Sequence, residues 1–280
     1  MQPPIAKALN YKVSFSIVLY EQAAKEITAV IDSLLLYKGE MRIFLIDNSS
    51  TDKLACLSDI AKCIEYHYTG KNIGFGKAHN TAFALAENWG SKYHFFVNPD
   101  ICYSKDVVAP MTEYMEKNHS IGQMMPRILF PDGRDQYLPK LTYSPSMLFW
   151  RKMKHPRRIH ERRMQIFEMR GMENDRIYDV ACVSGCFAVA RTDLLNTIGG
   201  FDDRFFLYFE DTDLSRRIHE IARTVYFPMV SVYHTYARGA QKSPKLFLIF
   251  ISSLIKYFNK WGWFLDKKRK QINDQVLRQL

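Results

Sequence analysis

The segment VSFSIVLY, residues Val13–Tyr20, decides the fold class, because its β-branched and aromatic residues predict a buried strand. Apolar residues then recur at helical spacing over Ala23–Tyr37. A second apolar run, Met41–Ile46, ends in Asp-Asn-Ser-Ser, whose side chains favour turns and helix N-caps, and we expect a helix over Lys53–Cys63. This alternation of strands and helices predicts an α/β fold with a parallel sheet.

The same alternation continues towards residue 100. Ile64–Tyr68 and Tyr93–Val97 are predicted strands, and Ala78–Asn88 has the spacing of a helix. Polar clusters follow the predicted strands, and the ligands of open α/β sheets bind at the carboxyl ends of strands. We therefore expect residues 1–100 to form a nucleotide-binding half.

A less regular region follows this half. Prolines and the basic run RKMKHPRRIHERR (Arg151–Arg163) fall within Phe130–Asp179, which predicts a mobile or lid-like insertion. Regular patterning returns at Val180–Ala190. Thr192–Ile198 is a predicted helix that ends at Gly199-Gly200, a pair suited to a helix C-cap.

Composition limits the possible functions. The 280 residues include 39 Lys and Arg against 29 Asp and Glu, a formal charge of +10 that attracts the phosphates of nucleic acids, lipid headgroups or diphosphate substrates. Five cysteines without paired CxxC spacing predict reduced thiols, and neither a disulfide framework nor a structural zinc site. The first residues carry no apolar signal-peptide core, so we expect a cytoplasmic protein.

The C-terminal segment, residues 241–280, differs from the rest of the chain. Its apolar run LFLIFISSLI (Leu246–Ile255) has ten residues, too few to span a bilayer at about 20 residues per crossing. Aromatic residues and the basic cluster Lys267–Lys270 follow it, which predicts an interfacial helix on an anionic membrane surface. The alternative, that the run packs on the preceding domain, stays open.

Four polar clusters carry the functional signal. They are Asp47–Ser50 (DNSS), Asn72–Gly76 (NIGFG) with Asn80, Asn98–Asp100 (NPD) and Phe209–Asp213 (FEDTD). Each cluster alone is most often a turn, a glycine loop or a strand end. Together with Gly199–Asp202 and His234, their order and spacing resemble the family 2 glycosyltransferases of the GT-A fold over roughly Ser14–Arg238.

The segment SGCFAVARTDLLNTIGGFDDRFFLYFEDTDLSRRI (Ser184–Ile218) resembles in particular the rhamnosyltransferase-like members that build O-antigens and related surface polysaccharides. The resemblance implies a Rossmann-like, mixed but mostly parallel sheet flanked by helices, with a C-terminal helical extension. It divides the chain into a catalytic domain, residues 1–240, and a membrane-associating extension, residues 241–280. Within the catalytic domain, residues 101–240 are the half that binds the acceptor and carries catalysis.

The implied reaction is an inverting, metal-dependent transfer of a sugar to a hydroxyl of a lipid-linked surface-polysaccharide intermediate, with polyprenyl diphosphate as the lipid carrier. The implied donor is dTDP-L-rhamnose, and a UDP-hexose or UDP-N-acetylhexosamine is the alternative. The implied location is peripheral, on the cytoplasmic face of the inner membrane. An inactive sugar-binding scaffold of the same fold is the alternative from a different functional class.

The resemblance assigns the nucleotide-sugar pocket to Tyr20, Asp47, Asn72, Gly74, Asn80, Asn98 and Asp100. Tyr20 would place its ring against the base, while its neighbours Leu19 and Glu21 differ from the usual turn of the family. Asp47 would accept a hydrogen bond from the imide nitrogen of uracil or thymine, which indicates a UDP or dTDP donor. Asn80 alternatively caps a helix or faces solvent.

Asp100 stands where many relatives carry Asp-x-Asp, and the resemblance makes it a ligand of Mg²⁺ or Mn²⁺ together with the phosphate oxygens of the donor. His234 resembles the late histidine that completes this site in some relatives, and a structural histidine is the alternative. Gly185, Asp213 and Arg238 are assigned to the acceptor or the diphosphate.

Asp211 is the implied catalytic base, because an inverting displacement needs a carboxylate on the face opposite the departing diphosphate. Glu210 belongs to the same catalytic motif, and it and Asp213 position the loop or bind the acceptor. The alternative is that these three acids form a solvated helix N-terminus stabilised by the helix dipole.

Two other functional classes are disfavoured. The basic run Arg151–Arg163 with the nearby Phe149 and Trp150 suits nucleic acid, but that function leaves the carboxylate clusters unexplained, and we expect no nucleic-acid partner. No GxGxxG follows the first predicted strand, so a dinucleotide-dependent oxidoreductase is not expected.

Overall fold

The computed structural model describes residues 11–153, 155–235 and 243–280 of the chain. In the first half, strands and helices alternate as predicted. The elements are β1 (Val13–Leu19), α1 (Ala24–Leu34), β2 (Met41–Asp47), η1 (Ala55–Ile60), β3 (Ile64–Tyr68), α2 (Phe75–Trp89) and β4 (Tyr93–Val97). The four strands are parallel, so their carboxyl ends lie at one edge.

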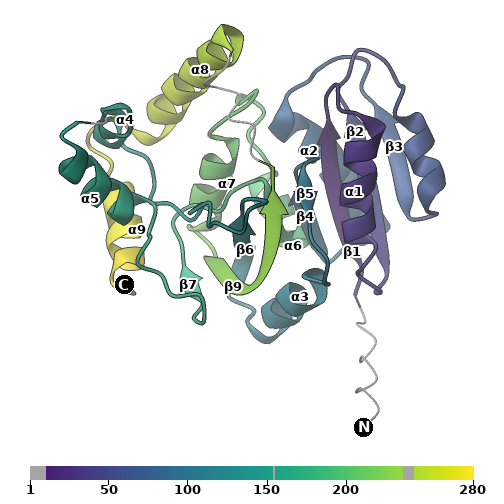
Figure 1. Cartoon of the computed structure of the whole chain (residues 1–280), viewed down its shortest axis with the longest axis horizontal. Coiled ribbons are helices and arrows are strands. Elements are labelled where there is room, and N and C mark those ends of the chain that lie inside the picture. Colours follow the sequence, from purple (N-terminus) through teal and green to yellow (C-terminus); the bar gives the residue numbers. More distant parts are fainter. Residues whose placement is uncertain (1–10, 154, 236–242) are drawn as a thin grey trace.

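β1 is buried along its whole length, because helices cover both faces of this part of the sheet (Figure 1). Alternate residues of a strand point to opposite faces. Val18 packs with Ala78 and Ala82 of α2, whereas Ile17 belongs to the main core together with Ile27 of α1. Burial on both faces explains why the β1 sequence reads as a nearly continuous apolar run.

The segment between β2 and β3 differs from the prediction. We expected an α-helix over Lys53–Cys63, but the structure has the shorter 3₁₀-helix η1 there. Leu57 is the single buried residue of η1, so the segment lacks the apolar stripe that stabilises an α-helix against a core. Short 3₁₀ turns are common in such connections.

The second half adds β5 (Ile101–Cys102), α3 (Val108–Lys117), β6 (Ile121–Leu129), α4 (Pro145–Lys152), α5 (Arg157–Phe167), β7 (Tyr178–Asp179), β8 (Phe187–Arg191), α6 (Thr192–Ile198), α7 (Glu210–Ile218) and β9 (Arg223–His234). Within the described residues, nine strands form one sheet in the order β3-β2-β1-β4-β8-β6-β9-β5, with β7 beside β9. β8 pairs antiparallel with β4 and β6, and β5 pairs antiparallel with β9. The sheet is therefore mixed and flanked by helices, which confirms the predicted fold class.

Two parts of the second half bear on the predictions. α6 has the predicted bounds, and Gly199 ends it in the left-handed conformation with φ of 72°. Residues 130–179, expected to form a mobile or lid-like insertion, contain α4 and α5 and bury Leu141, Met164 and Phe167. This insertion (residues 130–179) is therefore packed on the domain.

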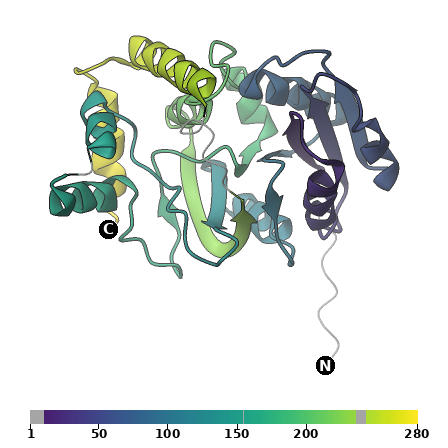
Figure 2. The ribbon, with the colours of Figure 1, turned by 45° about the horizontal axis from the view of Figure 1, so that its top comes forward.

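The C-terminal segment forms α8 (Pro244–Trp261) and α9 (Lys267–Leu277), which lie with α4 and α5 at the end of the molecule far from β3 (Figures 1 and 2). Tyr257, Phe258 and Val276 are buried, whereas Leu248 is 68% exposed. The tail (residues 243–280) therefore packs on the domain through part of its surface and leaves other apolar side chains uncovered. No helix in the described part of the chain is long and apolar enough to cross a membrane.

Candidate active site

The carboxyl ends of β1, β2 and β4 bring predicted polar clusters to one edge of the sheet. Leu19 pairs with Asp47 at the ends of β1 and β2. Asn98 follows β4 directly, and its N–H donates to the carbonyl of Cys186 at 2.8 Å, which ties the NPD turn to the start of β8. The clusters therefore meet where the ligands of open α/β sheets bind.

Asp47 is fully buried, and its carboxylate is used within the protein. Its Oδ1 accepts a hydrogen bond from the N–H of Ser49 at 2.8 Å, and its Oδ2 accepts one from the hydroxyl of Tyr66 at 2.7 Å. The structure does not present this carboxylate to a ligand, so the geometry favours a role in shaping the turn after β2. Tyr66 was not foreseen, because nothing in the sequence distinguishes it from the other aromatic residues of the strands.

Tyr20 lies at the accessible side of this edge, with 50% of its surface exposed. The next residue, Glu21, has φ of 56°. Its carboxylate accepts from the N–H of Ser50 at 2.8 Å, and its own N–H donates to Oγ of Ser49 at 2.8 Å. These bonds fix the turn that carries Tyr20 and leave its ring open to a stacking partner.

The glycine loop and Asn80 contact the segment that precedes α7. Oδ1 of Asn72 accepts from the N–H of Gly74 at 3.0 Å. Gly74 has φ of 93°, and a Cβ there would lie 2.7 Å from the carbonyl oxygen of Phe206, so the close approach requires glycine. Asn80 donates to the carbonyl of Phe201 and accepts from its N–H, both at 2.8 Å. Asn80 thus holds the protein together here, and Asn72 has the exposed side chain.

Asp100 and His234, the predicted metal ligands, are brought together by the sheet. Ile101 pairs with His234 across β5 and β9, and Oδ1 of Asp100 lies 3.2 Å from Nε2 of His234. Nδ2 of Asn98 lies 3.4 Å from the same nitrogen. The side chain of Asp100 is 32% exposed and that of His234 only 5%. The carboxylate is therefore accessible, while the imidazole is held in the wall of the site.

Gln136 fixes the orientation of His234, a contact that the sequence did not indicate. Nε2 of Gln136 donates to the carbonyls of His234 at 2.7 Å and Leu129 at 3.2 Å. Its Oε1 is therefore left to accept the Nδ1 proton of His234 at 3.1 Å. In the neutral imidazole, Nε2 then carries a lone pair on the side of Asp100. These two electron-rich atoms suit a shared cation, although the described residues contain no group of three or more His, Cys, Asp or Glu that could hold a metal ion.

Asp211, the predicted base, lies in the first turn of α7 and is partly exposed. Its Oδ2 accepts from the N–H of Gly185 at 3.1 Å, and its Oδ1 accepts from the N–H of Thr212 at 2.7 Å. A Cβ at position 185 would lie 3.3 Å from Cβ of Asp211, so glycine allows this close approach. Gly185 therefore orients the carboxylate.

The turn before α7 has an unusual backbone. Tyr208 and Phe209 have φ of 71° and 67°, a left-handed conformation that costs on the order of 1–3 kcal/mol for each residue. Phe209 is enclosed by rings whose centroids lie 5.2–5.4 Å from its own, those of Tyr143, Phe250 and Tyr257. Aromatic side chains of the insertion and of α8 therefore hold the strained turn that directs α7.

Glu210 is buried, with 6% of its surface exposed, and its Oε2 has no hydrogen-bond partner among the described residues. Burial, followed by the neighbouring carboxylate of Asp211, raises the pKa of Glu210 well above its usual range. This environment favours a protonated carboxyl, which differs from the solvated acid that a simple helix N-terminus would present.

Asp213 is also fully buried, and hydrogen-bond donors surround it. Nε of Arg217 lies 2.8 Å from its Oδ2, while Nζ of Lys260 and Nε1 of Trp261 lie 2.6 and 2.8 Å from its Oδ1. Because Lys260 and Trp261 belong to α8, Asp213 joins α7 to the tail. The geometry favours positioning of the loop over contact with an acceptor. Arg238, also assigned to the diphosphate, lies outside the described residues.

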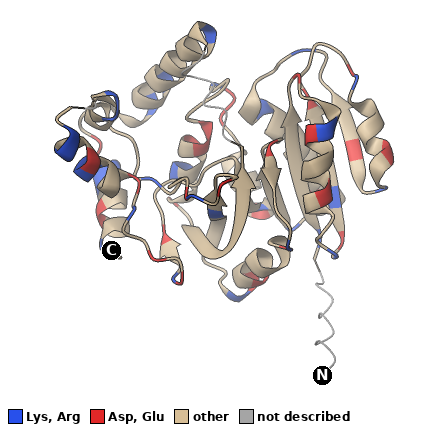
Figure 3. Cartoon of the chain, in the orientation of Figure 1, with Lys and Arg blue, Asp and Glu red and all other residues tan. Residues whose placement is uncertain are grey.

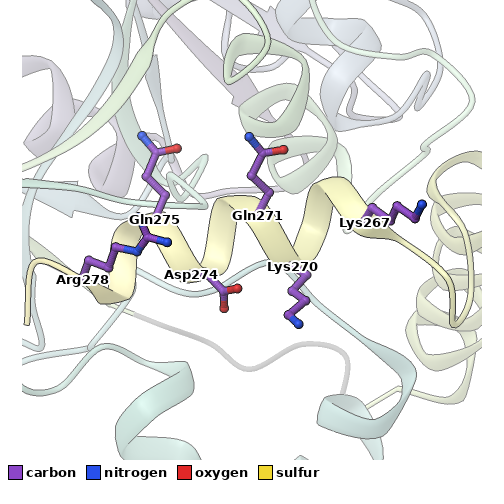
Figure 4. Close-up of a pocket in the computed structure, with 6 residues that line it drawn as sticks. All are labelled: Lys267, Lys270, Gln271, Asp274, Gln275 and Arg278. Atoms are coloured by element: carbon purple, nitrogen blue, oxygen red, sulfur yellow. The ribbon is translucent and has the colours of Figure 1, made fainter.

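A cavity of about 660 Å³ lies along α9 (Figure 4). The residues that line it all belong to this helix and are Lys267, Lys270, Gln271, Asp274, Gln275 and Arg278. None of the predicted site residues lines it. The candidate active site is therefore defined by the side chains around Asp100 and Asp211.

Comparison with known families and proteins agrees with the residue pattern. The model of the family described as Glycosyl transferase family 2 matches residues 14–199. An N-acetylglucosaminyl-diphospho-decaprenol L-rhamnosyltransferase of Mycobacterium tuberculosis is 25% identical over 223 residues, which cover 72% of this chain and 69% of the relative.

Solved structures with a similar fold include S. aureus TarS 1-349 in complex with UDP, with a TM-score of 0.60, 17% identity and coverage of 95% of this chain and 70% of that chain. GalNAc-T7 with UDP, GalNAc and Mn²⁺ matches 90% of this chain with a TM-score of 0.64 and 13% identity, and this chain spans 49% of it. The mannosyltransferase PcManGT from Pyrobaculum calidifontis, in complex with GDP-Man and Mn²⁺, matches 99% of this chain and 77% of its own with a TM-score of 0.54 and 14% identity. At these identities the likeness shows the fold, which is the predicted GT-A fold.

Proposed function

Since the chain belongs to glycosyl transferase family 2 and has the GT-A fold, we propose that it transfers L-rhamnose from dTDP-L-rhamnose, with inversion, to a hydroxyl of a lipid-linked surface-polysaccharide intermediate. The name of the M. tuberculosis relative specifies rhamnose and a sugar on a diphospho-lipid, which supports both halves of the proposal. A UDP-hexose or UDP-N-acetylhexosamine is the alternative donor within the same mechanism. No nucleic-acid partner is proposed.

Asp211 is the observation that carries the proposal. It is a partly exposed carboxylate whose direction is fixed by the N–H groups of Gly185 and Thr212. In an inverting transfer, a base must take the proton of the acceptor hydroxyl as that oxygen attacks the anomeric carbon. A carboxylate oriented by backbone donors suits this task. Buried Glu210 and Asp213 support the turn and the helix that carry it.

Asp100 and His234 fit a divalent metal. Because Gln136 accepts the Nδ1 proton, a carboxylate oxygen and an imidazole lone pair face each other at 3.2 Å, and both are ligands of Mg²⁺ or Mn²⁺ in proteins. Phosphate oxygens of the donor and water would supply the remaining ligands. When bound, such an ion neutralises the charge that builds on the departing diphosphate. Mn²⁺ in two of the similar structures supports the same assignment.

The nucleotide itself is assigned to the accessible residues of the strand edge. Tyr20 offers an exposed ring for stacking against the base, which contributes roughly 1–3 kcal/mol in other nucleotide complexes. Asn72 and Asn98 place amide groups beside it, and Asp47 supports the turn from below. The donor pocket therefore lies at the ends of β1, β2 and β4.

A donor panel tests the proposed function. Hydrolysis and transfer are followed with dTDP-rhamnose, UDP-glucose, UDP-galactose, UDP-GlcNAc and GDP-mannose, in the presence of Mn²⁺ or EDTA and of N-acetylglucosaminyl diphospho-prenol as acceptor. We expect a metal-dependent signal with dTDP-rhamnose. A signal with a UDP-sugar instead would move the donor and keep the mechanism, and no transfer with any donor would favour an inactive scaffold.

We also propose that the tail touches the cytoplasmic face of an anionic inner membrane. Leu248, Phe264 and Leu265 are 68%, 79% and 97% exposed, and Lys267 and Lys270 follow closely in the sequence. Apolar side chains beside cations are typical of peripheral membrane helices. The division into a catalytic domain, 1–240, and an extension, 241–280, holds as a proposal in which the two are joined by buried contacts.

Point substitutions test this contact better than deletion of the tail, because deletion would also remove the partners of Asp213. Phe264→Ser combined with Leu265→Ser should lower co-sedimentation with anionic vesicles several-fold and leave transfer to a soluble acceptor unchanged. Ile60→Ser, at an exposed site on η1, is the matched control. Unchanged co-sedimentation of the double variant would refute the membrane contact.

A further inference from the structure

Lys140 is a half-buried cation that the insertion brings next to the candidate base. It pairs with Cys182 in an isolated antiparallel bridge. Cys182 lies shortly before Gly185, whose N–H binds the carboxylate of Asp211. The bridge therefore holds Lys140 on the side of the molecule where Asp211 begins α7.

No acid neutralises Lys140 at close range. Among the residues that the structure describes, no carboxylate lies within 4.0 Å of its ammonium group. Burial and the positive charge of Arg151 lower the pKa of Lys140 to about 8, against weaker opposing effects of Glu168 and Asp211. Arg151 is exposed at the end of α4 and hydrogen-bonds to Tyr143, which packs on Phe209.

Two cations beside one catalytic carboxylate leave a surplus of positive charge. Moving a cation partly out of water without a partner costs free energy, so such a group is best explained by an anion that binds to it. Lys and Arg are the side chains that bind phosphate oxygens, Lys as a point charge and Arg through a planar fork. Further Lys and Arg lie on α4 and α5 (Figure 3). The chemistry of this side of Asp211 suits a phosphorylated ligand.

We propose that Lys140 and Arg151 form a subsite for the diphosphate of a lipid-linked acceptor. The subsite rests on the proposed function, because Asp211 is taken as the base that receives the acceptor hydroxyl. In a diphospho-lipid with a single sugar, the diphosphate is attached to the ring that carries the attacking hydroxyl, so it must bind one sugar ring away from the base. The diphosphate of the donor belongs to Asp100 and His234, and the two diphosphates therefore bind at separate sites.

Two acceptors that carry the same sugar test the subsite: N-acetylglucosaminyl diphospho-prenol and an alkyl N-acetylglucosaminide without phosphate. Lys140→Gln should raise KM for the diphospho-prenol about 10–100-fold, the loss expected when charge-assisted hydrogen bonds to phosphate are removed. KM for the alkyl glycoside and KM for the donor should keep their wild-type values. Lys140→Arg should restore most of the affinity, because it keeps the charge.

Lys152→Gln is the matched control, since Lys152 is also on α4 but its ammonium group lies 4.8 Å from the ring centre of Phe247. An equal loss with both acceptors would overturn the subsite and make Lys140 a support of Asp211. A raised KM for the donor alone would overturn it as well and assign the cations to the leaving diphosphate. Circular dichroism and thermal melting confirm that each variant is folded.

If the wild-type protein transfers to neither acceptor, the proposed function fails and the subsite is decided by binding alone. A short prenyl diphosphate is then titrated calorimetrically into wild type, Lys140→Gln and Arg151→Gln, without donor. Binding that weakens about tenfold or more in both variants would support a diphosphate site. Equal binding by all three proteins, or no binding by the wild type, would overturn it.

Discussion

Asp100 and Asp211 are both carboxylates of the candidate site, but the molecule holds them in different ways. Asp100 is fixed by the sheet: its carbonyl accepts from the N–H of Thr235 at 3.1 Å, and the next residue pairs with His234. Asp211 lies on a helix whose neighbours bond to the insertion and to the tail. The metal side is therefore complete within the sheet, whereas the base side depends on residues at the far end of the chain.

Arg216 is the centre of that dependence. Its guanidinium group donates to both carboxylate oxygens of Asp266, at 2.7 and 3.0 Å, and lies 4.2 Å from the ring centre of Trp261. The side chains of Arg216 and Asp266 are 1% and 4% exposed. Because Asp213 is bonded to α8 as well, α7 is attached to the tail at two points. The tail is thus part of the support of the base and not only a membrane contact.

Asp211→Asn should have the largest effect and should affect the base side alone. The amide keeps the size of the side chain but cannot take the proton of an acceptor hydroxyl, so kcat should fall about 10²–10⁴-fold. Calorimetric binding of Mn²⁺ and donor nucleotide should be unchanged, because Asp100 and His234 are untouched. Turnover close to that of the wild type would show that another group is the base.

Asp266→Asn should weaken the base side through its support. Removal of one partner of a buried ion pair leaves Arg216 uncompensated and should lower the free energy of unfolding by about 3–5 kcal/mol, measured by chemical denaturation. In the folded fraction kcat should fall while Mn²⁺ affinity stays constant. Asp274→Asn, an exposed carboxylate of α9, is the matched control. Equal losses of metal binding and kcat would mean that the two sides are not independent.

Gln136→Leu should weaken the metal side and spare the base. Without the acceptor for its Nδ1 proton, His234 loses its fixed tautomer and ring direction, so Mn²⁺ affinity should fall about 10–100-fold. Electron paramagnetic resonance of Mn²⁺ with dTDP measures this affinity directly. Tyr137→Phe, at the adjacent exposed position, should have no effect. Wild-type affinity in Gln136→Leu would exclude the positioning role.

The same contrast decides how much could be predicted from the sequence. β3, β4 and α6 have the predicted bounds because strand composition and a glycine helix cap are local signals. The pairing of Asp100 with His234 was predicted through the family resemblance and not from spacing. Gln136, Tyr66 and the tail contacts of Asp213 were missed, because the folded chain brings these side chains together and no periodicity links them.

Glu210→Gln should give the smallest effect and shows how tightly the base side is buried. An unfolded Glu ionises near its ordinary pKa of 4.5, whereas burial keeps Glu210 protonated to higher pH. The folded chain therefore binds one more proton in this window, and stability is lost as pH rises above about 4.5, by at most ~1.4 kcal/mol per pH unit. The Tm of Glu210→Gln should equal that of the wild type at low pH and exceed it increasingly towards neutral pH. Glu113→Gln, at an exposed site, should show no such trend, and a Tm difference independent of pH would mean that Glu210 ionises normally.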